Sequence, residues 1–139
     1  MYKRRKFLAQ VSPYGCFPTA VANAFVFSGL IPPDAALLVA RSRCEELRGR
    51  IDKVKFLRGV RGLHFQRAEA RQVLATAGIV TYCTRSYANH SAFFFRGNGK
   101  AYAVNANMET SALVETVSIR RFLAEYAGEL AKYEHWRLI

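Results

Sequence analysis

The spacing of apolar residues predicts a helix near the start of the chain, over residues 16–29. Five apolar side chains recur at i, i+3, i+4, i+7 and i+8 and would form one buried stripe: Phe17, Ala20, Val21, Ala24 and Phe25. Pro18 lies in the first turn, where its missing N–H has no intrahelical partner to lose. Gly29 follows the last apolar position and is expected to end the helix.

Two further helices are predicted in the first half of the chain. One begins at Pro33 and runs to about residue 48, because a proline followed by an acidic residue is typical of a helix start. Another spans residues 66–77 and is expected to stop at Gly78. The stretch 50–62 between them contains two glycines and is interpreted as a loop.

The second half of the chain changes to a strand pattern. Apolar and β-branched runs predict strands over residues 79–84, 91–96, 100–105 and 113–117. The run Phe93-Phe94-Phe95 is expected to be buried on both faces, and Gly97-Asn98-Gly99 predicts a tight hairpin. Ser118 would cap a last helix ending near residue 135. Helices followed by an antiparallel sheet and a final helix make an α+β fold.

The size and composition of the chain suit one compact domain. Its 139 residues are 51% hydrophobic and 13% aromatic, which is enough to fill a single core. Residues 1–9 contain four consecutive basic side chains, at positions 3–6, and are interpreted as a short flexible arm. No apolar stretch is long enough to cross a bilayer or to form a signal-peptide core, so we expect a cytoplasmic protein.

Cysteine usage and charge narrow the kinds of partner. The three cysteines are odd in number and contain no Cys-x-x-Cys pair, which argues against a disulfide framework and a structural zinc site. A net charge of +11 favours anionic partners such as nucleic acid or an acidic protein. Residues 41–71 hold ten Lys or Arg and four acidic residues, which indicates either a solvated basic face or a surface for such a partner.

Cys16 is the candidate nucleophile because it stands at the N-terminus of an apolar helix. The unpaired N–H groups and the dipole at a helix N-terminus favour the thiolate, which is the reactive form of cysteine. Acyl transfer also needs donors for the oxyanion that forms on attack. The Cys16 N–H is one such donor, and the side-chain amide of Gln10, six residues upstream, is the second.

His90 is the candidate base because it heads the phenylalanine-rich strand. The hairpin that follows returns to Asn105, whose side-chain carbonyl would accept the Nδ1–H of His90 and fix its tautomer. Asn107 is the alternative third member, since the return strand passes His90 between the two asparagines. His64 has no asparagine after a hairpin, and His135 is expected at the surface near the end of the last helix.

These motifs resemble the papain-like cysteine peptidase superfamily, in particular the peptidases that cut double-glycine leader peptides and their stand-alone relatives. The likeness rests on Gln10, on the stretch Cys16-Phe-Pro-Thr-Ala-Val-Ala22, on His90 at a strand start and on Asn105 after the return strand. Phytochelatin-synthase-like proteins share a similar start. The resemblance implies a single papain-like domain over residues 1–139, with N-terminal helices packed on a C-terminal antiparallel sheet, and a Cys-His-Asn triad that needs no metal or organic cofactor.

Two departures from that family are visible. Phe17 replaces the usual glycine after the nucleophile, and we expect its ring to narrow the site beside Cys16. Asn105 is followed by Ala106-Asn107 and not by Asp-Pro, which leaves the third member open between Asn105 and Asn107. Cys44 is interpreted as structural and Cys83 as a core residue.

Two functions of different classes follow from the sequence. The first is a cysteine peptidase, or a related thiol acyl-transfer hydrolase, that acts on a peptide or protein substrate through Cys16, His90 and Asn105, with Gln10 as oxyanion donor. The alternative is a non-catalytic papain-fold binding protein that holds nucleic acid or an acidic protein on its basic surface.

Overall fold

The fold was analysed in a computed structural model that describes residues 7–8, 15–50, 52–83, 90–97, 99–106, 111–116, 129–130 and 135–139. Its helices are α1 (Cys16–Ser28), α2 (Pro33–Glu46), α3 (Lys53–Arg58) and α4 (Ala70–Ala75). Its strands are β1 (Phe65–Arg67), β2 (Ala77–Cys83), β3 (His90–Gly97), β4 (Lys100–Ala106), β5 (Ser111–Thr116), β6 (Glu129–Leu130) and β7 (Trp136–Leu138).

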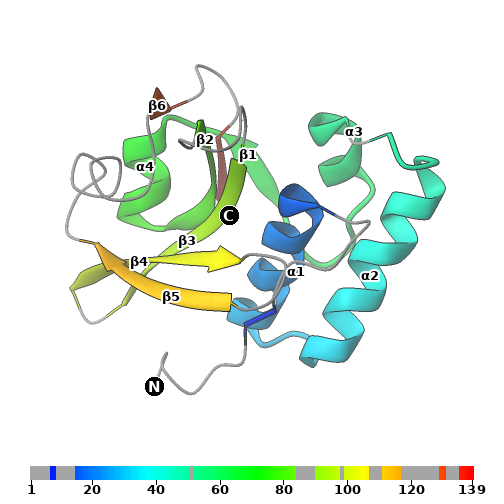
Figure 1. Cartoon of the computed structure of the whole chain (residues 1–139), viewed down its shortest axis with the longest axis horizontal. Coiled ribbons are helices and arrows are strands. Elements are labelled where there is room, and N and C mark those ends of the chain that lie inside the picture. Colours follow the sequence, from blue (N-terminus) through cyan, green and yellow to red (C-terminus); the bar gives the residue numbers. More distant parts are fainter. Residues whose placement is uncertain are drawn as a thin grey trace.

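The strands form one antiparallel sheet with the order β1-β7-β2-β3-β4-β5. Strand β6 pairs with the far end of β2, on the same side as β7. Helices α1 and α2 lie on one side of the sheet, and α4 covers the opposite face (Figure 1). This is the α+β fold that the sequence predicts, with α1, α2 and α3 preceding the sheet and α4 lying between β1 and β2 in the chain.

Helix α1 is central to the packing, because it lies between α2 and the sheet. All five residues of the predicted stripe are buried, and Gly29 ends the helix in the left-handed conformation, with φ 71°. Burial also extends around the whole helix from Phe17 to Val26, so the stripe prediction described only part of the contact. Among these residues Asn23 accepts the N–H of Leu8 at 2.7 Å and donates to its carbonyl at 3.2 Å.

Strand β3 is the central strand of the core. Phe93 and Phe95 face α1 and Phe94 faces α4, and all three are fully buried, as predicted for a strand covered on both faces. The hairpin to β4 is also confirmed: Gly97 pairs with Lys100, and Gly99 has the positive φ of 75° that such a turn requires.

The helix predicted over residues 66–77 is shorter than expected, and a strand precedes it. The helix begins only at Ala70, because Glu69 and Gln72 form a capping box there, and residues 65–67 pair with β7 as β1. Gly78 is not a helix stop but lies inside β2. A Cβ at this position would come within 2.0 Å of the Trp136 carbonyl oxygen, so β7 can approach β2 only at a glycine.

Helix α3 lies within residues 50–62, for which the sequence predicts a loop. Asp52 caps it by accepting the Lys55 N–H at 3.1 Å, and Phe56 anchors it in the core. With only six residues, it is too short for a clear amphipathic period, which explains why the pattern did not predict it.

The predicted last helix, residues 118–135, falls mostly outside the described residues, but two of its positions are wrong. Glu129–Leu130 form strand β6, and His135 is 4% exposed and not at the surface. The Nδ1 atom of His135 accepts the Thr81 N–H at 3.2 Å, between the parts of β2 that pair with β7 and with β6. An imidazole nitrogen therefore takes the place of a missing strand acceptor.

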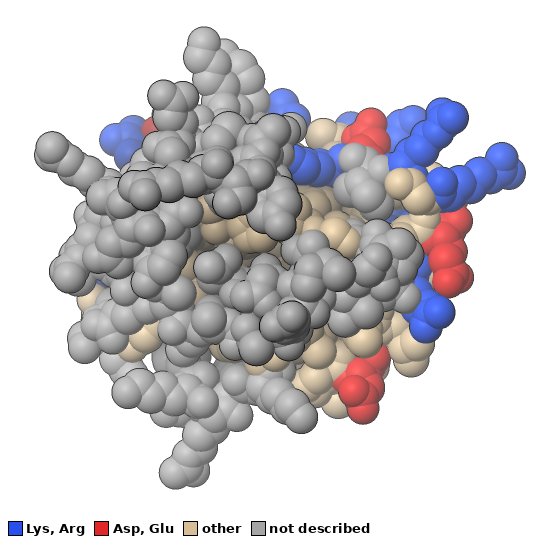
Figure 2. Space-filling view, viewed as in Figure 1, with Lys and Arg blue, Asp and Glu red and all other residues tan. Residues whose placement is uncertain are grey.

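Basic side chains gather on the side of the molecule formed by α2 and α3, with acidic side chains between them (Figure 2). The ion pairs there are short-range and exposed, such as Arg41–Glu45 at 3.6 Å within α2. No helix in the described part of the chain is both long and apolar enough to cross a membrane.

Candidate active site

Cys16 is the first residue of α1, and the turn before it depends on glycine. Gly15 has φ 75° and ψ −177°, a conformation that side chains with a Cβ rarely adopt. The Thr19 hydroxyl donates to the Gly15 carbonyl at 2.7 Å and fixes this entry into the helix. Among the described residues, no side chain caps the N-terminus and the first turn of α1 holds no acidic residue, so Cys16 lies at the positive end of the helix dipole.

The start of strand β3 contacts the sulfur of Cys16. The Ser91 backbone N–H donates to Cys16 Sγ at 3.4 Å, and the cysteine is half-buried. Since the Cα of a residue lies about 2.4 Å from the next amide nitrogen, Sγ is within about 6 Å of the His90 Cα. The structure thus brings the predicted nucleophile to the first residues of the strand that the predicted base begins.

Tyr82 lies against His90 from the neighbouring strand. The two residues are direct partners in the β2–β3 ladder, and their rings meet edge to face with centroids 5.3 Å apart and an interplanar angle of 73°. Burial, and then the charge of the nearby Cys16, raise the pKa of the Tyr82 hydroxyl far above its usual range. The hydroxyl is therefore neutral at any pH at which the protein would work.

A buried polar chain supports the strands behind the sulfur. The hydroxyls of Thr81 and Ser91 are hydrogen-bonded at 2.9 Å across the β2–β3 pair, and Thr81 in turn donates its N–H to His135. Ser91 is therefore held by the backbone pairing of its strand and by the hydrogen bond of its side chain. Both interactions fix the position of the N–H group that contacts Cys16. Sequence reasoning missed Tyr82, Thr81 and Ser91, because only the register of β2 against β3 places them at the site.

Phe17 does not narrow the site as expected. Its side chain is 3% exposed and points into the core, where its ring meets Phe56 at 5.6 Å and Trp136 at 5.5 Å, both edge to face. A helix residue next to the first position projects in a different direction from it, since successive residues are about 100° apart. Lys53 Nζ lies 5.8 Å from the Phe17 centroid and brings a positive charge near the start of α1.

The other predicted site residues are only partly described. Gln10 and Asn107 lie outside the described residues. Asn105 lies in β4, where it pairs with Ala112 of β5, and the structure describes its backbone position only. The Nδ1 bond that would orient His90 is therefore a proposal, and His64, which the sequence ranked below His90, is exposed.

The remaining cysteine with a described side chain differs sharply from Cys16. Cys44 is buried on α2, and burial followed by the charge of Glu45 raises the pKa of its thiol. Burial and a raised pKa both fit the expectation that Cys44 is a structural or incidental residue. Within the described residues, no group of three or more His, Cys, Asp or Glu side chains is placed to hold a metal ion.

Comparison with known proteins identifies the fold. No protein-family model matches the chain, and no curated protein matches its sequence. A crystal structure of a double glycine motif protease from an AMS/PCAT transporter, in complex with the leader peptide, superposes with a TM-score of 0.54. The match covers 97% of this chain and 94% of that one at 12% sequence identity. This chain has a papain-like fold. At such identity the papain-like likeness concerns the fold, and the chemistry rests on the residues described above.

Proposed function

We propose that the protein is a cysteine peptidase or a related thiol acyl-transfer hydrolase, with Cys16 as nucleophile and His90 as base. The observation that carries this proposal is the contact between the Ser91 N–H and Cys16 Sγ, which sets the sulfur beside the start of the His90 strand. A papain-like fold at a TM-score of 0.54 supports the same reaction class. Asn105, or in its place Asn107, orients His90, and Gln10 is the side-chain oxyanion donor.

Two sources of positive partial charge face the sulfur of Cys16. The helix N-terminus and the Ser91 N–H both direct positive partial charge toward the sulfur, and hydrogen bonding to the charged form of a group stabilises that form. The edge-to-face ring of Tyr82 restricts the orientation of His90. The proposed reaction uses Cys16 and His90 as its nucleophile and base.

The proposed reaction proceeds in two steps. The Cys16 thiolate attacks the peptide carbonyl carbon, and the resulting oxyanion is held by the Cys16 N–H and the Gln10 amide. The His90 imidazolium donates its proton to the leaving amine as the C–N bond breaks, which leaves a thioester. Water, deprotonated by His90, then attacks the thioester, releases the carboxylic acid and regenerates the thiolate–imidazolium pair.

Selective alkylation tests this proposal without a known substrate. Cys16 should react with iodoacetamide at mildly acidic pH much faster than Cys44 or Cys83, and His90→Ala should abolish that low-pH reactivity. Cys44→Ala is the matched control and should leave the fast phase unchanged. Equal, slow labelling of all three cysteines would refute the peptidase proposal. The function to examine would then be anion binding on the basic side of α2 and α3, measured by retention of the Cys16→Ala variant on a polyanion column.

A further inference from the structure

An open groove lies between helix α3 and strands β1 and β7, apart from the proposed catalytic residues. It encloses a hollow of ≈ 560 Å³. Its exposed lining is about half apolar and half polar. Leu57 on α3, Phe65 on β1 and Trp136 on β7 are among the apolar residues, and Arg58, His64 and Arg67 are the polar ones. A concave surface that combines apolar side chains with a few charged groups is the usual form of a specific binding site.

Strand β1, which lines this groove, is the last strand of the sheet on this side in the described structure. In its pairing with β7, the His64 carbonyl accepts the Ile139 N–H at 2.9 Å and the Ala68 N–H donates to His135 at 3.0 Å. Along an antiparallel strand, the peptide groups of successive residues point alternately toward one neighbouring strand and away from it. Because those of residues 64 and 68 point toward β7, the N–H and C=O groups of Phe65 and Arg67 point away from it. β1 ends the sheet, so these N–H and C=O groups have no strand partner in the described structure.

The two arginines of the groove are available to a ligand. Within the described part of the chain, neither Arg58 nor Arg67 makes an ion pair or a side-chain hydrogen bond, and both are exposed. Phe65 and Arg67 lie on the same face of β1, two residues apart, as their shared lining of the groove shows. The groove therefore presents one apolar and one cationic position at strand spacing.

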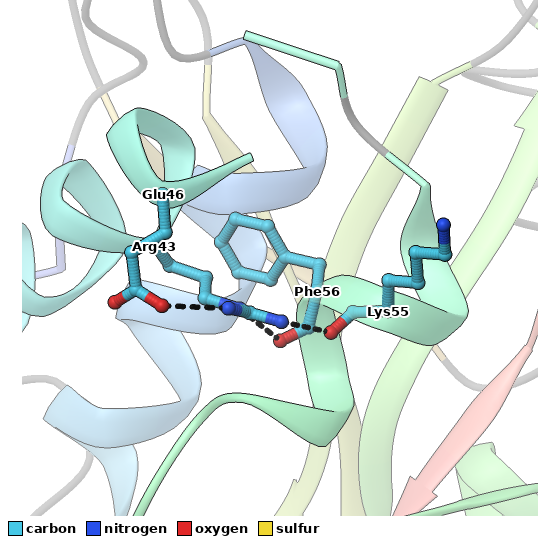
Figure 3. A network of polar contacts seen from close by, with 4 residues as sticks. All are labelled: Arg43, Glu46, Lys55 and Phe56. Atoms are coloured by element: carbon cyan, nitrogen blue, oxygen red, sulfur yellow. Dashed lines mark hydrogen bonds and ion pairs between the residues drawn. The ribbon is translucent and has the colours of Figure 1, made fainter. Parts of the chain in front are cut away.

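The α3 wall of the groove is held rigidly. Arg43 of α2 donates to the carbonyls of Lys55 and Phe56 near the end of α3 and also pairs with Glu46 at 2.7 Å (Figure 3). The guanidinium occupies the space that a Cβ at Gly59 would need. On the opposite wall, the ring of Trp136 packs edge to face against Phe17 in the core, which also holds this wall in place.

We propose that the groove binds an extended, acidic segment of the peptide substrate as an added strand on β1. The segment places an apolar side chain opposite Phe65 and an Asp or Glu opposite Arg67, two residues along, with Arg58 contributing to the attraction. Main-chain hydrogen bonds to the Phe65 and Arg67 peptide groups hold the segment, and the two side-chain positions select its sequence. That the bound segment is part of a substrate rests on the proposed function. That the groove binds an acidic strand rests on the groove alone.

Trp136 is the only tryptophan of the chain, so its fluorescence reports directly on the groove. In the experiment, the Cys16→Ala protein, which cannot cleave a substrate, is titrated with a short peptide. Every second residue of this peptide is alternately Leu or Glu, so that both lie on the same face when the peptide forms a strand. A saturable change in Trp136 emission is expected. The same peptide with Lys for Glu should bind about tenfold more weakly, and N-methylation of its alternate amides should abolish binding because strand addition needs those N–H groups.

Two protein variants separate charge in the groove from overall charge. Arg58→Glu with Arg67→Glu should weaken the Glu peptide about tenfold at low salt, whereas Arg50→Glu, an exposed arginine outside the groove, should change little. Equal binding of the Glu and Lys peptides, insensitivity to N-methylation, or no saturable signal would each overturn the proposal. If the peptide binds but Cys16 of the unmodified protein is unreactive at low pH, the peptidase proposal is refuted and the groove proposal is supported. If Cys16 is reactive but the peptide does not bind, the groove proposal is refuted and the peptidase proposal is supported.

Discussion

Ser91 donates its backbone N–H to the sulfur of Cys16 across 3.4 Å, and so connects two residues that are 75 positions apart in the chain. The contact uses the main chain of Ser91, whereas the hydroxyl of the same residue is engaged by Thr81 at 2.9 Å. The two roles of Ser91 can therefore be separated by mutation.

Ser91→Ala keeps the amide and removes only the hydroxyl. The rate of Cys16 alkylation at mildly acidic pH should stay within about twofold of wild type, because the thiolate keeps its donor. The free energy of unfolding should fall by about 1–3 kcal/mol, since the buried Thr81 hydroxyl loses its partner. Urea denaturation and iodoacetamide labelling measure the two quantities, and a large loss of reactivity in this variant would contradict the backbone role.

Tyr82 should position His90 through its ring and not through its hydroxyl. Tyr82→Phe preserves the edge-to-face contact and should retain most of the low-pH reactivity of Cys16, whereas Tyr82→Leu removes the ring and should shift the alkylation profile toward higher pH. Rate against pH for the three proteins is the measurement. If the Phe and Leu variants behaved alike, the ring contact would have no role in orienting the base.

The same tyrosine should make the fold sensitive to alkali. Burial raises the pKa of Tyr82 in the folded protein, so above about pH 10 the unfolded chain releases a proton that the folded chain keeps. The folded state then binds more protons, and stability falls as pH rises, by at most about 1.4 kcal/mol per pH unit for this one group. Urea unfolding of wild type and Tyr82→Phe between pH 8 and about pH 11 should show a shallower decline for the variant.

His135 should contribute to stability as an acceptor inside the sheet. His135→Ala leaves the buried Thr81 N–H without the imidazole nitrogen and opens a space beside β2, which should cost about 2–4 kcal/mol of unfolding free energy. His64→Ala, at an exposed position, is the control and should change stability by less than about 0.5 kcal/mol. Similar losses in both variants would contradict this role.

Sequence patterns correctly predicted the elements whose packing or pairing partners lie close to them in the sequence. The stripe of α1, the Gly97–Gly99 hairpin and the buried Phe93–Phe95 run depend on residues within one element or its neighbour. Strands β1 and β7 have three residues each and pair across a separation of about seventy residues. They are therefore too short to show an alternating hydrophobic pattern that would predict them. The sequence predicts a helix stop at Gly78, because the close approach of the Trp136 carbonyl to this residue exists only in the folded chain.

The candidate site divides in the same way. Cys16 was recognised from a helix start and His90 from a strand start, and each signal lies within about ten residues. Tyr82 could have been found only by aligning β2 with β3, which requires the length and path of the connection between them. The roles of Gln10, Asn105 and Asn107 stay predictions.

The position of β7 between β1 and β2 bears on how the protein is made. A nascent chain can form α1, α2 and the β2–β3–β4 meander as it emerges, but β1 has no neighbour in the sheet until residues 136–138 have been synthesised. Until then the apolar wall that carries Phe65 is unsealed, and the exposed strand edge is open to other chains. The pairing of β1 with the rest of the sheet and the burial of Trp136 are therefore among the last events in the folding of the nascent chain.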